Sequence, residues 1–388
     1  MRPNFEVRPQ EIYMDNAATT VIDGEVVAAM QPYLEERYGN PQTPYHLGRE
    51  AKDAIETARS QVADLLGCKP EEIYFTSGGT EANNWAIKGF SCQRTRLVVS
   101  AVEHKSVLEP ARWMAKRGLF GDLAEIPVDG DGRVRLDILE SYLKTGLVGL
   151  VSVQYANNEV GTIQPVGAIS ELCSQHGATF HCDAVQAYGK TLFKADELGA
   201  GMISLSAHKI HGPMGVGALY VKQGTPIEPL LHGGGHEQGL RSGTHPVPQI
   251  VGFGKAAELA WSAMKSEMPR ISRMVEFLAG ELKIKLKAVR NGLAQDRLPN
   301  ILNVTFPGKD ASLLCGILGR HGICVSMGSA CRTGSGESHV LKAMGKQYKD
   351  CTSSIRISLS RYTEQQDAIG LVARMQSAMV ELDKRDVL

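Results

Sequence analysis

The sequence predicts an α/β protein with a mostly parallel sheet, and two observations lead to this prediction. Short apolar runs alternate with helix-like segments through the first two-thirds of the 388 residues. One run, residues 146–155, is almost wholly apolar, as expected of a strand that is buried on both faces. Repeated strand–helix–strand units form parallel sheets with right-handed crossovers. Ligands of such sheets bind beyond the carboxyl ends of the strands.

The strand-like segments of this first part are short and end at turn or helix signals. They span residues 71–77, 96–102, 123–128, 146–155, 178–186, 201–209 and 216–222. Helix-like spacing of apolar residues covers residues 80–90, 103–118 and 167–176. Gly118 and Gly177 stand where the second and third of these helices should end, which is a favoured place for glycine.

Near residue 260 the pattern changes. A long helix-like stretch at 254–288 precedes the shorter apolar runs 300–306, 323–328 and 355–360 and a polar C-terminal helix from 363 onward. A chain of this length also exceeds the size at which a single core stops growing. We therefore expect a large α/β domain at residues 16–260 and a smaller α+β domain built from residues 1–15 and 261–388.

Composition excludes several classes of function. The 42 basic and 42 acidic residues give a formal charge of zero, which leaves no electrostatic footprint for nucleic acid or an anionic membrane. No segment approaches the roughly 18 apolar residues of a membrane span, and the N-terminus lacks the apolar core of a signal peptide. The eight cysteines show no C-x-x-C spacing, which argues against a zinc site and a disulfide framework. We expect a cytoplasmic protein that binds no metal, no membrane and no nucleic acid directly.

The segment TSGGTEANN, residues 76–84, has the pattern of an anion-binding turn. A strand ends at Thr76, Gly78 and Gly79 form a turn, and Thr80 begins a helix. Free backbone N–H groups and the helix dipole both favour a phosphate at such a position. Simple turn geometry and helix capping would also explain these residues. Neither G-x-G-x-x-G nor a P-loop occurs at this strand end, which disfavours a dinucleotide or triphosphate ligand.

Two further strand ends carry chemically useful side chains. Lys209 lies where a buried strand gives way to a glycine-rich loop, and HCDAVQ places Asp183 and Gln186 just after another strand. A lysine at a strand end is often solvated, but one that faces a pocket can form a Schiff base with an aldehyde. A carboxylate at the same edge could keep a pyridinium nitrogen protonated. A phosphate turn, a carboxylate and a lysine on successive strand ends together indicate a pyridoxal phosphate (PLP) site.

Cys331 lies in the segment VSMGSACRTGSGESHV, residues 325–340. A cysteine on a glycine-rich segment beside Arg332 is more exposed and more easily ionised than a cysteine that packs in a core. These are the conditions for a reactive thiolate. The other seven cysteines are expected to be packing residues.

The chain resembles the NifS/IscS-like cysteine desulfurases, which belong to the class V group of fold-type I PLP enzymes. The blocks that carry the resemblance are YMDNAATT (13–20), TSGGTEANN (76–84), VEHKSVL (102–108), NNEVGTIQP (157–165), HCDAVQ (181–186), SAHKIHGPMGVGALY (206–220), LHGGGHEQGLRSGTHPVPQIVGFGKAAELA (231–260), GSAC (328–331) and IRISLSRYT (355–363). The resemblance implies a large domain with a mostly parallel seven-stranded sheet, a smaller α+β domain, and conversion of L-cysteine to L-alanine with PLP as the cofactor.

The resemblance also implies a role for each matching residue around the cofactor. Lys209 would bind the cofactor aldehyde and transfer a proton, Asp183 would pair with the pyridinium nitrogen, and His104 would stack on the ring. Gln186 and Asn157 would form hydrogen bonds near the phenolic oxygen and the substrate. The residues expected to bind the phosphate are Gly79, Thr80, Ser206 and His208, with Thr244 supplied by the second subunit of a homodimer.

For the substrate, the resemblance implies that Arg356 binds the carboxylate of L-cysteine, a task suited to a bidentate donor, with Asn16 nearby. The thiolate of Cys331 would attack the substrate sulfur and become a persulfide. The sulfur would then pass to an acceptor protein that supplies iron–sulfur clusters or the thio-modification of nucleic acid.

The chain departs from the family pattern at several points. GSAC is followed by RTGSGESHVL, one residue shorter than is common and without a proline before Ser338, and Tyr45 occupies the place of a histidine. These changes suggest a divergent member with its own sulfur acceptor. A selenocysteine lyase, a class V aminotransferase and a non-catalytic scaffold of the same fold are the alternatives. A transaminase needs no thiol nucleophile, so replacement of Cys331 separates it from a desulfurase.

Overall fold

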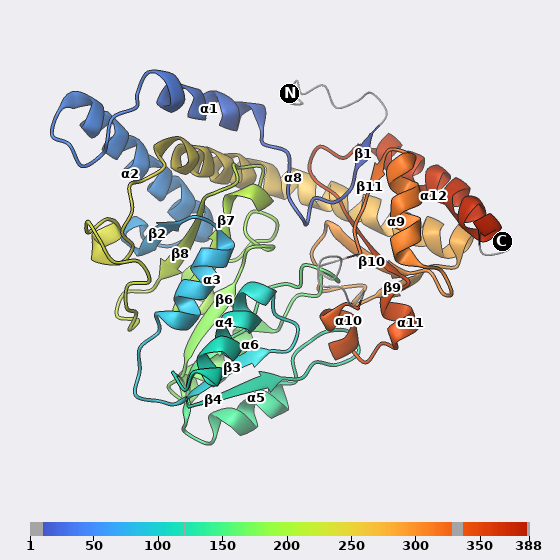
Figure 1. The fold of residues 1–388 in the computed structure, drawn as a ribbon, viewed down its shortest axis with the longest axis horizontal. Coiled ribbons are helices and arrows are strands. Elements are labelled where there is room, and N and C mark those ends of the chain that lie inside the picture. Colours follow the sequence, from blue (N-terminus) through green and yellow to red (C-terminus); the bar gives the residue numbers. More distant parts are fainter. Residues whose placement is uncertain (1–10, 120, 328–336, 386–388) are drawn as a thin grey trace.

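The computed structural model describes residues 11–119, 121–327 and 337–385. Its central element is a seven-stranded sheet (Figure 1). The strand order is β2 (Ile73–Thr76), β8 (Gly217–Val221), β7 (Met202–Ser206), β6 (Thr179–Asp183), β5 (Val148–Ser152), β3 (Arg96–Ser100) and β4 (Asp122–Ile126). Strand β8 runs antiparallel to both of its neighbours, and the other pairs are parallel. The predicted α/β fold with a mostly parallel seven-stranded sheet is confirmed.

Helices cover both faces of this sheet because its strands alternate between two hydrophobic clusters. In β2, Ile73 and Phe75 face one cluster, whereas Tyr74 faces the other. The helices of the large sheet are α1 (Gly24–Glu35), α2 (His46–Leu66), α3 (Gly79–Lys88), α4 (Lys105–Lys116), α5 (Leu136–Leu143), α6 (Val166–Gln175) and α7 (Ala195–Leu198). Helices α3 and α4 pack together in the cluster of Tyr74, and α2 contributes to the cluster of Phe75.

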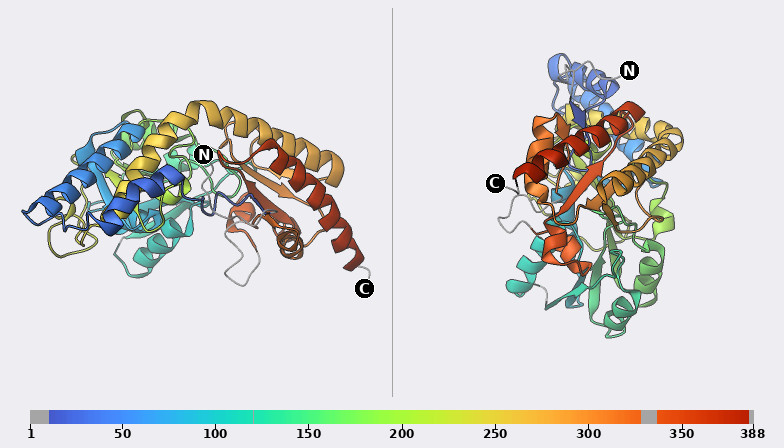
Figure 2. Two further views of the ribbon diagram at one scale, coloured as in Figure 1. Left: turned by 90° about the horizontal axis from the view of Figure 1, so that it is seen from above. Right: turned by 90° about the vertical axis from the view of Figure 1, so that its right-hand side faces the viewer.

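A second group of elements forms two small sheets. Antiparallel strands β12 (Ser354–Ser358), β10 (Ile301–Thr305) and β9 (Val289–Asn291) form one, and parallel strands β1 (Ile12–Tyr13) and β11 (Ile323–Cys324) form the other. The accompanying helices are α9 (Ala311–Arg320), α10 (His339–Ala343), α11 (Tyr348–Cys351) and α12 (Gln365–Arg385). These elements, orange and red apart from the blue β1, lie together at one end of the molecule (Figures 1 and 2).

Helix α8 (Val247–Leu286) joins the two groups, and Figure 2 shows it running from one to the other. Its residues as far as Met264 pack in the large-sheet core, whereas Ile271 and those beyond it pack with the small sheets. At the N-terminus, Met14 lies in the small-sheet core and Ala17 in the large one. The chain thus changes core near both expected boundaries, but the second change falls inside a continuous helix. The domain limits stay a prediction.

Two expectations about surface and core can also be compared with the structure. Within the described residues, no helix is both long and apolar enough to cross a lipid bilayer. Cys173, Cys182 and Cys351 are buried and Cys68, Cys315 and Cys324 are partly buried, in keeping with packing roles. Cys92 is exposed, so the packing interpretation is wrong for that residue. It follows α3 in an irregular connection, where burial is not imposed by a strand or helix face.

Candidate active site

A large pocket opens at the carboxyl ends of the central strands, with a volume of about 750 Å³. The large-sheet strands β2, β6 and β7 deliver residues to it, and Asp15, Ser326 and Arg356 come from the small-sheet side. The pocket therefore lies between the two cores. The residues expected from sequence that line it are Gly79, Thr80, His104, Asp183, Gln186, Ser206, His208, Lys209 and Arg356.

The turn between β2 and α3 has the geometry of an anion cradle. Gly78 adopts φ 149° and ψ 179°, a conformation that glycine alone tolerates easily. A Cβ atom at Gly79 would lie 2.7 Å from Cγ2 of Val185, so a side chain there would clash. No described side chain caps α3, whose first N–H groups have no partner within the helix. The cradle thus offers backbone donors and the positive end of a helix dipole to an anion.

Lys209 lies directly after β7, in a single turn of 3₁₀-helix, η2 (Ala207–Lys209). Its Nζ atom donates hydrogen bonds to the carbonyl oxygens of Ala17 at 2.7 Å and Ala18 at 2.6 Å. Burial, and then the positive charge of Arg356, lower the pKa of Lys209 to about 8. An amine with such a pKa is neutral in about a tenth of the molecules at pH 7, far more than an ordinary lysine, as a nucleophilic or proton-transferring lysine needs to be.

Asp183 ends β6 and is buried. Its Oδ2 atom accepts a hydrogen bond from Nδ2 of Asn83 at 2.7 Å, and its Oδ1 atom accepts one from the backbone N–H of Val185 at 3.0 Å. Asn83 also donates to Ser106 at 2.8 Å, which fixes its amide. The carboxylate is therefore held rigidly at the rear of the pocket, with lone pairs remaining for a ligand donor.

His104 caps the N-terminus of α4, since its Nδ1 atom accepts the backbone N–H of Ser106 at 3.1 Å. The ring is open to the pocket. The surrounding protein lowers the pKa of His104 by desolvation, and the positive charge of Lys209 lowers it further. His104 is thus a neutral ring of fixed orientation. Burial likewise lowers the pKa of His208 to about 4, so this second imidazole is also neutral at physiological pH.

Arg356 enters the pocket from β12 and is 4% exposed. Its Nη1 atom donates to the carbonyl oxygen of Asn158 at 3.0 Å, and its Nη2 atom pairs with Oδ1 of Asp15 at 2.8 Å. The Nε atom is buried and has no hydrogen-bond partner among the described residues. A guanidinium with an unused donor in a pocket is suited to a carboxylate ligand.

Three of the expected residues that the structure describes do not line the large pocket. Asn157 is buried, and its Oδ1 atom accepts the backbone N–H groups of Glu159 and Val160, so it stabilises its own loop. Asn16 donates to the carbonyl oxygen of Ser358 and lines a smaller neighbouring cavity. Thr244 is exposed on the segment before α8. Cys331 lies outside the described residues.

The segment that carries Thr244 is anchored by a buried carboxylate. Glu237 accepts two hydrogen bonds from Arg59 at 2.8 and 2.9 Å, one from the backbone N–H of Phe75 at 2.7 Å, and forms a 2.5 Å contact with His245. Burial by itself would raise the pKa of Glu237, but the hydrogen bonds from Arg59 and His245 outweigh it and hold the pKa at about 2. We call these four residues the Glu237 cluster.

Sequence reasoning missed three residues that shape the pocket or its wall. Asp15 pairs with Arg356, Asn83 holds Asp183, and Lys190 is buried beside Gln186. Asp15 and Asn83 lie within the quoted blocks YMDNAATT and TSGGTEANN, and Lys190 follows Gln186 by four residues, so only position in space distinguishes them. Among the described residues, no group of three or more histidine, cysteine or acidic side chains could bind a metal ion.

Comparison with known proteins agrees with this architecture. Residues 12–371 match the family described as aminotransferase class-V. Over 364 residues, 92% of each chain, the sequence is 42% identical to a cysteine desulfurase IscS from Dictyoglomus turgidum. A solved structure named NifS-like protein superposes with a TM-score of 0.90 at 38% identity, covering 96% of this chain and 100% of that one. The structure named SspA in complex with cysteine gives a TM-score of 0.80 at 33% identity, covering 91% and 99%.

A mixed sheet of this order, with a lysine, a carboxylate and a glycine cradle at its carboxyl edge, defines the class of fold-type I enzymes that use PLP. Within that class, the chain belongs to the class-V aminotransferase family and to its cysteine desulfurase group.

Proposed function

We propose that this chain is a PLP-dependent cysteine desulfurase, which converts L-cysteine to L-alanine and transfers the sulfur to Cys331. One observation carries the proposal: Lys209, Asp183 and Arg356, which come from both cores, line a single pocket. That SspA, a relative in structure, is named as a complex with cysteine supports cysteine as the substrate here.

The residues present fit the cofactor. The cradle at Gly78 and Gly79 excludes side chains and offers backbone donors to a phosphate, with Thr80, Ser206 and His208 beside it. Asp183 would pair with the pyridinium nitrogen, and the neutral ring of His104 would stack on the pyridine face. When bound, PLP supplies an electron sink for the bonds broken at the substrate carbon.

The protein side chains would then orient the substrate and move its proton. Arg356 would bind the substrate carboxylate through its guanidinium, sharing Nη2 with Asp15. Lys209, with its pKa of about 8, would accept the proton of the substrate α-carbon and return it later. Asn16 and Asn157 do not line the large pocket. Their side chains donate hydrogen bonds to the carbonyl oxygens of Ser358 and Val102 and so support the segments around the site.

The sulfur step is assigned to Cys331. Its thiolate would attack the sulfur of bound cysteine, so that an S–S bond forms, the Cβ–S bond breaks, and the electron pair returns to the carbon. The sulfur becomes a persulfide on Cys331, and after protonation the carbon skeleton leaves as alanine. Release of the persulfide sulfur requires a thiol reductant or an acceptor protein.

Further features extend the proposal to assembly and location. Thr244 is exposed and outside the pocket of its own chain, which suits a homodimer in which it reaches the phosphate site of the second subunit. The zero formal charge suits delivery of sulfur to an acceptor protein, for iron–sulfur clusters or thio-modification, rather than direct contact with nucleic acid. We place the protein in the cytoplasm.

The test is formation of L-alanine from L-cysteine by PLP-loaded protein with a thiol present, beside the variant Cys331→Ala. Alanine that matches sulfide and disappears in the variant supports the proposal. Alanine from selenocysteine alone would favour a selenocysteine lyase, and amino transfer to an oxo acid that survives Cys331→Ala would favour an aminotransferase. Protein that holds PLP but forms no product even with a sulfur-acceptor protein added would contradict the proposal.

A further inference from the structure

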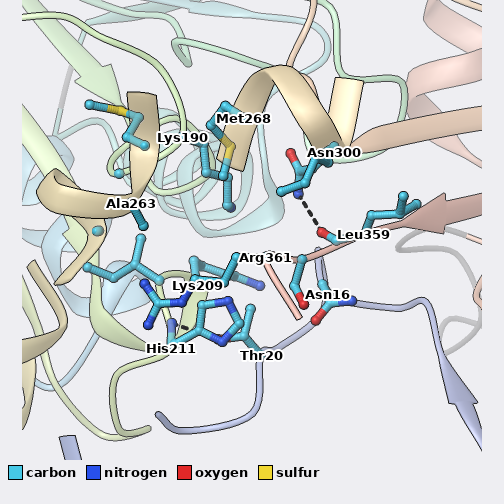
Figure 3. Close-up of a pocket in the computed structure, with 16 residues that line it drawn as sticks. Asn16, Thr20, Lys190, Lys209, His211, Ala263, Met268, Asn300, Leu359 and Arg361 are labelled. Carbon is cyan, nitrogen blue, oxygen red and sulfur yellow. Dashed lines mark hydrogen bonds between the residues drawn. The ribbon is translucent and has the colours of Figure 1, made fainter. Parts of the chain in front are cut away.

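Lys190 is a buried lysine that the proposed mechanism does not use. The residue is 7% exposed and, together with Lys209, lines a small cavity of about 30 Å³ (Figure 3). The apolar part of the cavity wall includes Met264 and Met268 of α8. No carboxylate is among the described residues that line this cavity. Burying an amine without an anion is costly, so its hydrogen bonds must account for its position.

Those hydrogen bonds go to one residue of the active site. Nζ of Lys190 donates to the backbone carbonyl of Gln186 at 3.1 Å and to the side-chain Oε1 atom of Gln186 at 3.3 Å. Because a lysine at this site offers hydrogens to both atoms, the side-chain atom that faces it must be oxygen. The Nε2 atom of Gln186 therefore points the other way, where it donates to the carbonyl oxygen of Ala17 at 2.9 Å.

The same carbonyl connects Gln186 to Lys209. Ala17 O accepts hydrogen bonds from both Gln186 Nε2 and Lys209 Nζ. Gln186 also lines the large pocket, and its NH₂ group has a second hydrogen that this contact does not use. The contacts Lys190–Gln186–Ala17–Lys209 thus form one continuous hydrogen-bonded chain beneath the site.

We propose that Lys190 is a positioning residue, which holds the side-chain amide of Gln186 so that its Nε2 hydrogens, and not Oε1, face the cofactor pocket. The inference rests on the proposed function, because Gln186 would then donate a hydrogen bond to the phenolic oxygen of PLP. Without Lys190 the amide could turn over and present an acceptor to an anionic oxygen. Loss of the charge does not by itself remove the two contacts, since a neutral amine still has two hydrogens, one for each oxygen of Gln186.

Burial and the charged groups near Lys190 lower its pKa, so the lysine need not be ionised to act as a donor. Burial, followed by the positive charges of Lys209 and Arg356, lowers the pKa of Lys190 to about 7. Arg361 and His211 also line the small cavity, but Arg361 is paired with Asp23, and burial lowers the pKa of His211 to about 3. Near neutral pH the lysine exists in both forms, and each can hold Gln186.

The experiment is a double-mutant cycle on PLP-loaded protein, with the pH midpoint of the visible absorption band as the readout. Lys190→Met should raise this midpoint, which reports ionisation of the bound cofactor, by about one pH unit, or about tenfold in the ionisation equilibrium. The reason is that loss of a donor to the phenolic oxygen disfavours the deprotonated form of the cofactor. Lys190→Gln, a neutral donor, should keep the midpoint within about 0.3 unit of wild type. In the background Gln186→Ala, Lys190→Met should cause no further change.

Two results would overturn the inference. One is an unchanged midpoint in Lys190→Met. The other is a change caused by Lys190→Met that is equally large in the Gln186→Ala background, because it would then reflect charge or packing and not the orientation of Gln186. If Lys190→Met does not fold, wild-type protein with ¹⁵N-labelled glutamine side chains gives the answer. The side-chain NH₂ signal of Gln186 is identified by its absence from the spectrum of Gln186→Ala. This signal should shift when PLP is added to the wild type, and an unshifted signal contradicts the inference. Absence of any visible band in wild type would instead contradict the proposed function.

Discussion

Replacement of Glu237 by glutamine should destabilise the protein strongly, although Glu237 lies outside the pocket. The side chain is 1% exposed and accepts hydrogen bonds from Arg59, Phe75 and His245 in the Glu237 cluster. The variant Glu237→Gln keeps the shape but removes the negative charge, which leaves the guanidinium of Arg59, itself 9% exposed, without its main partner. Breaking one side of a buried ion pair costs about 3–5 kcal/mol.

The pKa of Glu237 gives a second route to the magnitude. Its folded pKa of about 2 lies below the ordinary value of 4.5, and a difference of about 2.5 at about 1.4 kcal/mol per unit corresponds to about 3.5 kcal/mol. Because the folded pKa is depressed, this stability is fully present above pH 4.5 and is lost as the pH falls towards 2. Two independent arguments thus give a similar figure.

Urea unfolding followed from pH 7 down towards pH 2 is the assay, because the Glu237 contribution is lost between about pH 4.5 and pH 2, and Glu56→Gln is the matched control. Glu56 also contacts Arg59, at 3.2 Å, but its side chain is 54% exposed, so its removal should cost at most about 1 kcal/mol. Glu237→Gln should lower the urea midpoint clearly more than Glu56→Gln and flatten the decline of stability towards acid. Equal midpoints for the two variants, or an unaltered decline, would refute the reasoning.

Three further predictions concern the pocket. Arg356→Lys, which loses the bidentate fork, should lower kcat/KM for L-cysteine by roughly 10–100-fold, mainly through KM; an effect confined to kcat would contradict substrate binding by Arg356. Gly79→Ala would place a Cβ atom 2.7 Å from Val185 and should weaken PLP binding by at least roughly tenfold in an equilibrium titration, whereas unchanged affinity would exclude a close backbone approach. Asn83→Ala removes a 2.7 Å donor from Asp183 and should weaken PLP retention on dialysis by roughly three- to tenfold, and retention equal to wild type would show that Asp183 needs no such support.

Much of the fold and of the pocket could be predicted from sequence, because local pattern determines strands and the ends of parallel strands meet at one edge. The apolar runs 71–77 and 201–209 contain β2 and β7. Gly79 follows β2, Lys209 follows β7, and both residues line the same pocket. The long helix expected at 254–288 is confirmed as α8, but the pattern gave no sign that this helix already begins at Val247.

Which of the expected residues meet in one pocket depended on contacts distant in sequence. Asn157 belongs to a quoted block, yet its side chain is occupied by its own loop, while Asp15, 341 residues from Arg356 along the chain, became its ion-pair partner. A pattern read along the chain reports hydrophobicity and turn geometry, and it holds no information on which polar atoms are already paired.

The sequence by itself determined the α/β class, the seven-stranded sheet and the family, because these follow from periodicity and from ordered motifs. Only the tertiary structure decided that Lys190 lies beneath Gln186, that Glu237 anchors the segment of Thr244, and that Arg356 has an unused donor. The physical reason is that burial and hydrogen bonding are properties of a packed interior, where the environment of each polar atom is set by residues from several separate segments.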